Sequence, residues 1–232
     1  MVRRPTVCLL VLLGAAFVWT LATAQAGAAS GGPLAEQLYE GSAEQKAYSE
    51  FNHRLSGAVL LMIGGLFVLK ERGSVTRRWL ALWPFGLLYL AGYLVVWSDH
   101  DAWPVGSQSF AQTFFSGDLE TVQHKLYAVV LFALGALEWA RLEGRAPQWG
   151  DLLFFGIVAF AGLLMLHHSH LMAHNHHSPA LLSDHVLLGA LTIGSAGVKL
   201  AWERRWMTWR HGGLLWPGSV LLIGALLVFY TE

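Results

Sequence analysis

The strongest constraint on how this chain folds is a series of apolar segments that are each close to the length of a membrane span. These segments cover residues 54–69, 79–97, 126–140, 152–168, 186–201 and 214–230. A transmembrane helix needs ~20 predominantly apolar residues, and several segments reach that length only when their polar flanks are included. In lipid, segments of this kind satisfy their own backbone hydrogen bonds by forming helices. The sequence therefore predicts an all-α fold, a polytopic transmembrane helix bundle of about six spans joined by short loops.

Composition and cysteine content exclude several classes of protein. Charged residues make up 13% of the 232 residues, about half of the ~25% typical of soluble domains, so the lipid bilayer is the expected surrounding of most of the chain. The sequence has no Gly-rich phosphate-binding loop and no basic patch suited to nucleic acid, so no nucleic-acid partner is expected. Cys8 is the only cysteine, and any metal ligands must therefore be His, carboxylate or Met side chains.

The N-terminus has the pattern of a secretory signal. Arg3 and Arg4 precede an apolar run at residues 7–19, and two A-x-A cleavage patterns end at Ala24 and Ala26. An uncleaved anchor helix is the alternative. We therefore expect three parts: a signal peptide at residues 1–26, an exported polar linker or short surface helix at 27–50, and a six-helix transmembrane domain at 51–232.

The distribution of Lys and Arg predicts the orientation of the bundle. Most of them lie in or near the loops after the first, third and fifth spans, whereas the other side has only Lys46, Arg54 and Lys125. By the positive-inside rule the richer side is cytoplasmic, which agrees with export of the mature N-terminus by the signal. We expect a multi-pass protein of the bacterial inner membrane with its mature N-terminus extracytoplasmic. The residues on the cytoplasmic side are Lys70, Arg72, Arg77, Arg78, Arg141, Arg145, Lys199, Arg204, Arg205 and Arg210.

Histidines gather on the exported side of this topology, where all of the 11 except His211 fall. The densest group is a His-rich run at residues 167–177, and short tracts of this composition are typical of metal binding. If the fourth helix continues through the run, its histidines recur on one face, where pairs one turn apart can chelate a metal ion. A polar interfacial loop that happens to use His is the alternative. The predicted ligands from this run are His167, His168, His170 and His174.

A second pattern links the starts of the first, third and fifth spans. His53, His124 and His185 each follow a polar residue and precede a small residue four positions on, namely Gly57, Ala128 and Gly189. Three histidines at one depth predict a shared site, because ionisable residues near the membrane interior are functional candidates by default. Separate interfacial hydrogen bonds are the alternative.

Asp99-His100-Asp101, after the second span, adds carboxylates beside an imidazole. Either acid could ligate a metal or orient a ligating histidine. Met165 and Met172 flank the His-rich run, and thioether with imidazole suits copper, whereas imidazole with carboxylate suits zinc. We expect a site that holds copper, with zinc and haem b as alternatives. Its predicted residues are His53, Asp99, His100, His124, His167, His168, His170, His174 and His185.

Two further groups are interpreted as structural. Glu138 and Lys199 lie near the cytoplasmic ends of the third and fifth spans, where they can pair with each other or with Arg141 and Glu203. Most Trp residues, including Trp83 and Trp216, lie near span ends, as an aromatic belt at the membrane interface requires.

A short multi-span chain with exported His, Met and Asp residues is similar to the copper-resistance D (CopD) group of bacterial membrane proteins. The likeness covers the hydropathy pattern and the histidine placement across residues 50–230. It implies handling of copper at the inner membrane.

The leading hypothesis from the sequence is an integral membrane metal-binding protein with a His-rich site on its periplasmic face. It would bind, deliver or transport copper, with a periplasmic metalloprotein as a candidate partner. A membrane b-type cytochrome would instead use two of His53, His124, His168 and His185 as axial haem ligands. A metal-dependent membrane enzyme and a pH sensor also remain open, and no catalytic residue is predicted.

Overall fold

The structure, a computed structural model, describes residues 43–99, 101–115, 119–174 and 179–231, and within these ranges it is helical with no strand. The predicted all-α fold is therefore confirmed for the described residues. Three short elements accompany the longer helices: α4 (Arg77–Leu80), α6 (Phe110–Phe115) and the 3-10 helix η1 (Gly212–Leu214). The longer helices are α3 (Ala43–Glu71), α5 (Leu82–Trp97), α7 (Leu119–Leu142), α8 (Gly150–His174), α9 (Pro179–Glu203) and α10 (Leu215–Val228).

Each of these longer helices corresponds to one of the apolar segments predicted from the sequence. Most of them extend beyond the apolar core into polar residues, as α3 does at its start. Residues 43–50 are rich in Ala, Glu, Gln and Lys, which favour helix. The helix therefore takes in the last part of the region predicted as a linker or short surface helix. The predicted signal peptide and the rest of that linker lie outside the described residues.

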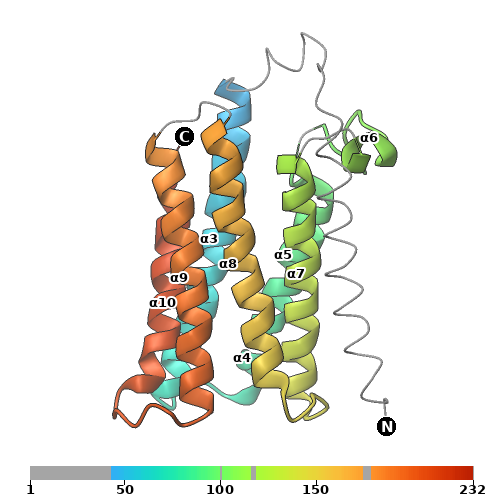
Figure 1. Ribbon diagram of the computed structural model, residues 1–232. Coiled ribbons are helices and arrows are strands. Elements are labelled where there is room, and N and C mark those ends of the chain that lie inside the picture. The colour runs from blue at the N-terminus through green and yellow to red at the C-terminus, as the bar shows by residue number, and fades with distance from the viewer. Residues whose placement is uncertain (1–42, 100, 116–118, 175–178, 232) are drawn as a thin grey trace.

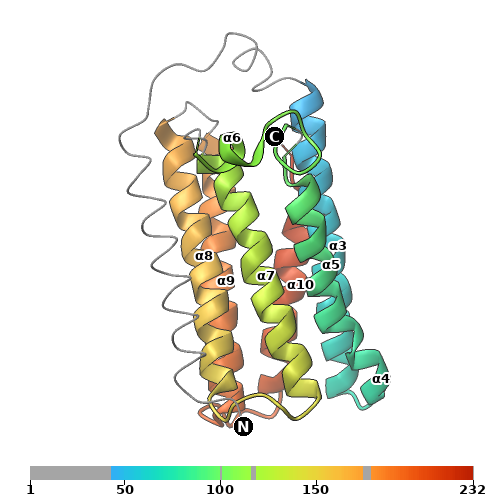
Figure 2. The ribbon, with the colours of Figure 1, turned by 90° about the vertical axis from the view of Figure 1, so that its right-hand side faces the viewer.

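The longer helices run side by side and form a ring (Figures 1 and 2). Each helix packs against the next one along the chain, and α10 returns to pack against α3, which closes the ring. The contacts are uneven. Extensive contact joins α3 to α10, α5 to α7 and α8 to α9, and looser contact joins these three pairs to one another.

Four helical stretches are long and apolar enough to cross a membrane: Lys46–Glu71, Arg78–Trp97, Gly150–His167 and Ser183–Glu203. The apolar stretch that contains α10 is shorter. Their length and composition are compatible with a multi-pass membrane protein. The six spans predicted from the sequence remain a prediction.

The two ends of the bundle differ in composition. His53, His124 and His185 lie at the end where α3, α7 and α9 begin, which we call the histidine end. The opposite end, where these helices finish, holds the loops with most of the Lys and Arg side chains, and we call it the basic end. The sequence predicted that the basic loops and the histidines lie on opposite sides, and the structure places these loops and the three histidines at opposite ends of the ring.

Glycines allow the paired helices to approach closely. A Cβ atom added to Gly57 of α3 would lie 2.6 Å from the backbone oxygen of Gly224 in α10. A Cβ added to Gly189 of α9 would lie 2.9 Å from the backbone oxygen of Gly162 in α8. Small residues at helix crossings are the usual device for such packing in membranes, because lipid offers no hydrophobic driving force between helices. The small residues noted after His53 and His185 therefore lie at helix crossings.

Two tryptophans depart from the predicted aromatic belt. Trp83 and Trp216 are 3% and 7% exposed and pack inside the bundle, with ring centroids 5.7 Å apart. Trp79 and Trp206, by contrast, are exposed, as the belt requires. The prediction was wrong for Trp83 and Trp216 because nearness to a span end does not say whether a side chain faces lipid or the bundle interior.

The close approach at Gly57 gives a test of the packing. We expect Gly57→Ala to lower the free energy of unfolding by about 1–3 kcal/mol, because the added methyl group overfills the α3–α10 contact. Gly65→Ala on the same helix is the matched control, since its Cβ would meet no atom within 4 Å. Replacing a helical glycine with alanine there should leave stability unchanged or raise it by up to ~1 kcal/mol. Unfolding in mixed micelles measures both, and equal effects would contradict the close contact.

Candidate functional site

The ring of helices encloses a cavity of about 360 Å³. All six longer helices contribute side chains to its wall. At the histidine end the wall includes Ser98 and Asp99, and toward the basic end it includes Trp83, Phe154 and Trp216. Pockets that bind small molecules have volumes of ~300–1,000 Å³, so this cavity is large enough to be a binding site.

His53, His124 and His185 all line this cavity. They come from α3, α7 and α9, which belong to three different pairs of the ring. The ring centroids of His53 and His185 are 6.1 Å apart and their planes are nearly perpendicular, at 87°. His124 is close enough to His185 and to Asp99 to interact electrostatically with both. The structure therefore brings together the three span-opening histidines that the sequence predicted to share a site.

A backbone contact fixes the tautomer of His53. Its Nδ1 atom lies 2.8 Å from the backbone oxygen of Ser49, one turn earlier in α3. Because a carbonyl oxygen only accepts, Nδ1 carries the proton and Nε2 of the neutral ring carries the lone pair. Metal-ligating histidines commonly make this kind of contact through their other nitrogen. His53 is thus held as a potential Nε2 ligand.

Tyr230 packs against the same histidine pair. Its ring stacks on His53 with centroids 4.0 Å apart and lies edge-on to His185 at 5.9 Å. The side chain is 4% exposed although it lies only two residues from the end of the chain. Tyr230 therefore holds the His53 ring in place. No sequence pattern indicated this role, because the contact joins the last span to the first.

Asp99 is held at the cavity wall by two hydrogen bonds. Its Oδ1 atom accepts from the backbone N–H of Asp101 at 2.9 Å, and its Oδ2 atom accepts from the Thr121 hydroxyl at 2.8 Å. The second bond ties the end of α5 to the start of α7, close to His124. Its interaction with His124 is electrostatic, and the two predicted roles of Asp99, metal ligand or orienting partner of a histidine, remain predictions.

The C-terminal end of α5 is satisfied by side chains from its neighbours. The last carbonyls of a helix have no partner within it. Asn52 and Tyr48 of α3 donate to the backbone oxygen of Trp97, at 3.2 and 2.7 Å, and Lys125 of α7 donates to that of Val95 at 2.7 Å. These bonds fasten α3, α5 and α7 together at the histidine end. The sequence indicates only the charge of Lys125 and gives no sign of this role.

The remaining predicted site residues are less fully described. His167 is exposed near the end of α8. α8 continues to His174, so the predicted extension of this helix into the His-rich run is seen for its backbone. The side chains of His168, His170 and His174 and the whole of His100 and residues 175–178 lie outside what the structure describes. Among the described residues, no three His, Cys, Asp or Glu side chains form a ready-made metal-binding group.

Aromatic rings close the cavity toward the basic end. Trp83, Phe154 and Trp216 contact one another with centroids 5.7 to 6.3 Å apart, and Phe67 packs edge-on against both tryptophans. We call Phe67, Trp83, Phe154 and Trp216 the aromatic floor. Lys199 lies against it, with its Nζ atom 4.6 Å from the Phe154 centroid and 4.9 Å from that of Trp216.

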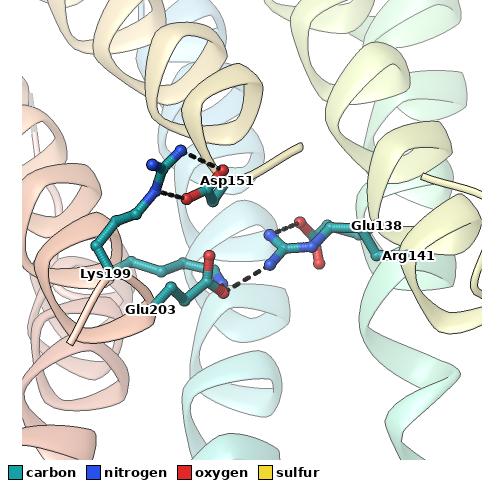
Figure 3. Close-up of polar contacts among 6 residues, drawn as sticks. Glu138, Arg141, Asp151, Lys199 and Glu203 are labelled. Atoms are coloured by element: carbon teal, nitrogen blue, oxygen red, sulfur yellow. Dashed lines mark hydrogen bonds and ion pairs between the residues drawn. The ribbon is translucent and has the colours of Figure 1, made fainter. Parts of the chain in front are cut away.

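Beside the aromatic floor is a cluster of buried charges (Figure 3). Lys199 pairs with Glu203, Arg141 bridges Glu203 at 2.8 Å and Glu138 at 3.0 Å, and these bonds join α7 to α9. Lys199 is 6% exposed and Glu138 is 5% exposed. Of the two pairings that the sequence left open, the structure shows Glu138 with Arg141 and Lys199 with Glu203. The charges therefore compensate one another, and the cluster is interpreted as structural.

No protein family, characterised protein or solved structure matches this chain.

The buried charge cluster predicts that replacing Lys199 of α9 and replacing Arg204, just after this helix, have different effects on stability. Lys199→Met should lower the free energy of unfolding by about 3–5 kcal/mol, because it leaves buried carboxylates without full compensation. Arg204→Met removes the partner of Asp151 in an exposed pair at the same end and should change stability little. Unfolding in mixed micelles measures both variants, and a Lys199→Met protein as stable as the parent would show that the cluster is not needed.

Proposed function

We propose that this protein is an integral membrane metal-binding protein that handles copper through a histidine site at one end of its helix bundle. The observation that supports this most is the convergence of His53, His124 and His185, from three helices, on one cavity. Neutral imidazole is the commonest side-chain ligand for transition metals. With metal–nitrogen bonds of ~2.0 Å, two imidazoles on one ion have ring centroids roughly 5–6 Å apart, close to the 6.1 Å between His53 and His185.

The rest of the wall favours copper over a hard cation. Met165 of α8 lines the same cavity as the three histidines, and thioether with imidazole is a donor set that suits copper, especially Cu(I). Asp99 supports His124 electrostatically. Zinc is the alternative ion, since imidazole with carboxylate suits it as well.

In this proposal the His-rich run captures metal ions and supplies them to the cavity histidines. α8 ends at His174, so the backbone of this part of the run lies at the same end of the bundle as the three cavity histidines. His167, His168, His170 and His174 would capture the ion, and His53, His100, His124 and His185 would hold it. The basic end would face the cytoplasm and the histidine end the periplasm, where a metalloprotein could deliver or receive copper.

A b-type cytochrome is the second candidate. It is favoured by His53 and His185 lying opposite each other on α3 and α9, since axial haem ligands come from facing helices at one depth. A visible spectrum of the purified protein separates the two candidates, because haem gives a Soret band and a copper or zinc ion at these histidines does not.

The metal proposal is tested by metal content and affinity of the full chain, purified with a tag that contains no histidine. We expect one tightly bound copper ion per chain. His53→Ala, His124→Ala and His185→Ala should each weaken it by more than the ~10- to 100-fold that removal of an outer-shell partner costs. His211→Ala, at the basic end, is the control and should leave the affinity unchanged.

Replacing His167, His168, His170 and His174 together with Ala should remove additional, weaker binding and leave the tight ion in place. A protein that binds neither copper nor zinc would contradict the proposal, and so would tight binding that survives in all three cavity variants.

A further inference from the structure

The cavity is long. Trp83 near the start of α5 and Ser98 just after its end both line it, and their separation of fifteen positions corresponds to roughly 22 Å at 1.5 Å per residue. That length is most of the ~30 Å thickness of the hydrocarbon core of a bilayer. The cavity therefore extends along most of the bundle axis, and we call it the tunnel.

Polarity is confined largely to one end of this tunnel. The histidines, Ser98 and the two aspartates line the histidine end, and the far end is the aromatic floor. Between them the wall is mainly aliphatic, with Tyr127, Thr192 and Ser195 as polar side chains. Two of these are already engaged: the Tyr127 hydroxyl donates to the backbone oxygen of Ala161 at 3.0 Å, and the Ser195 hydroxyl contacts that of Ser219 at 2.8 Å. The middle of the wall is formed by Leu60, Leu90, Val130, Leu131, Val158 and Leu188.

An empty space of this size lowers the stability of the bundle, because the destabilisation caused by a cavity grows with its volume. Water fills a cavity only where several polar partners are available, and the middle of the tunnel offers few of them. One extended hydrocarbon chain has about the length of the tunnel, and such chains are abundant in a bilayer.

The polar end indicates the head group that such a chain would carry. The Ser98 hydroxyl is buried at the cavity wall and has no hydrogen-bond partner among the described residues. The Asp99 charge is offset by Lys125, with which it interacts electrostatically, and Asp101 adds a further carboxylate to the wall. An anionic head would be repelled here, whereas an uncharged hydroxyl or carbonyl could bond to Ser98 and to the histidines.

We propose that the tunnel binds a single-chain amphiphile, with its uncharged hydroxyl or carbonyl head at the histidine end and its chain along the bundle axis down to the aromatic floor. This site does not depend on a metal ion at the histidines. It goes beyond the proposed function, because it gives the bundle an organic ligand of a defined class.

The test is photolabelling of the full chain in lipid nanodiscs, in the presence and absence of a metal chelator, with hexadecanol that carries a diazirine at mid-chain. We expect crosslinks at Leu131 and Val158 that excess unlabelled hexadecanol removes. Crosslinks at the exposed residues Phe132 and Leu163 report the bilayer and should persist under competition. Absence of competed labelling inside the tunnel would overturn the proposal.

Two matched variants locate the chain. Ala161 lines the tunnel, whereas Ala159 lies two residues earlier on α8 and does not. Ala161→Phe should reduce the competed labelling by about tenfold, because the ring takes the space of the chain, and Ala159→Phe should leave it unchanged. Equal effects of the two variants would overturn the proposal.

A smaller substitution, Ser98→Ala, tests the binding of the head group and is not expected to prevent folding. Ser98→Ala should weaken competition by hexadecanol about 5-fold, the loss of one hydrogen bond, and leave competition by hexadecane unchanged. Hexadecanoate should compete poorly with the parent protein. An equal effect of Ser98→Ala on both competitors, or competition by hexadecanoate as strong as that of hexadecanol, would overturn the assigned head. Because the labelling is read without metal, its failure is distinguishable from failure to bind copper.

Discussion

The backbone contact between paired helices at two glycine positions determines where the site side chains lie. Gly57 against Gly224 brings α3 and α10 together one turn from His53, and Gly162 against Gly189 brings α8 and α9 together one turn from His185. The first contact places Tyr230, just after α10, on the face of His53. Because close contact is concentrated within pairs, the three pairs meet more loosely around a central space. The histidines at the pair ends therefore face a common cavity.

Hydropathy and histidine placement were enough to predict the helices and part of the site. The apolar segments became the longer helices, since lipid-compatible runs of that length have few other folds. His53, His124 and His185 could be grouped because they occupy the same position relative to three helix starts. The ion pairs of Glu138 and Lys199 could be predicted only as alternatives. Each charge has a possible partner one turn away on its own helix, and the sequence does not show whether a charge on another helix lies closer.

Contacts between distant segments could not be predicted in this way. Trp83 and Trp216 are near helix starts in sequence, but the rotation of each helix about its axis turns them inward. Tyr230 on His53 and Thr121 on Asp99 depend on which helices are neighbours in the ring. The tunnel has no signature in one sequence either, because all six longer helices contribute to it and no segment is distinctive alone.

The two ends of the cavity have different environments. Buried compensated charges and the aromatic floor lie near the basic end of the bundle. The polar groups at the histidine end are fixed by bonds to helix ends, as His53 is by Ser49 and α5 by Asn52.

The most direct test of the central claim is the position of the metal in crystals of the copper-loaded protein, from anomalous scattering at the copper edge. We expect a peak within about 2 Å of imidazole nitrogens of at least two of His53, His124 and His185. A copper peak found only at the His-rich run, with none in the cavity, would contradict it.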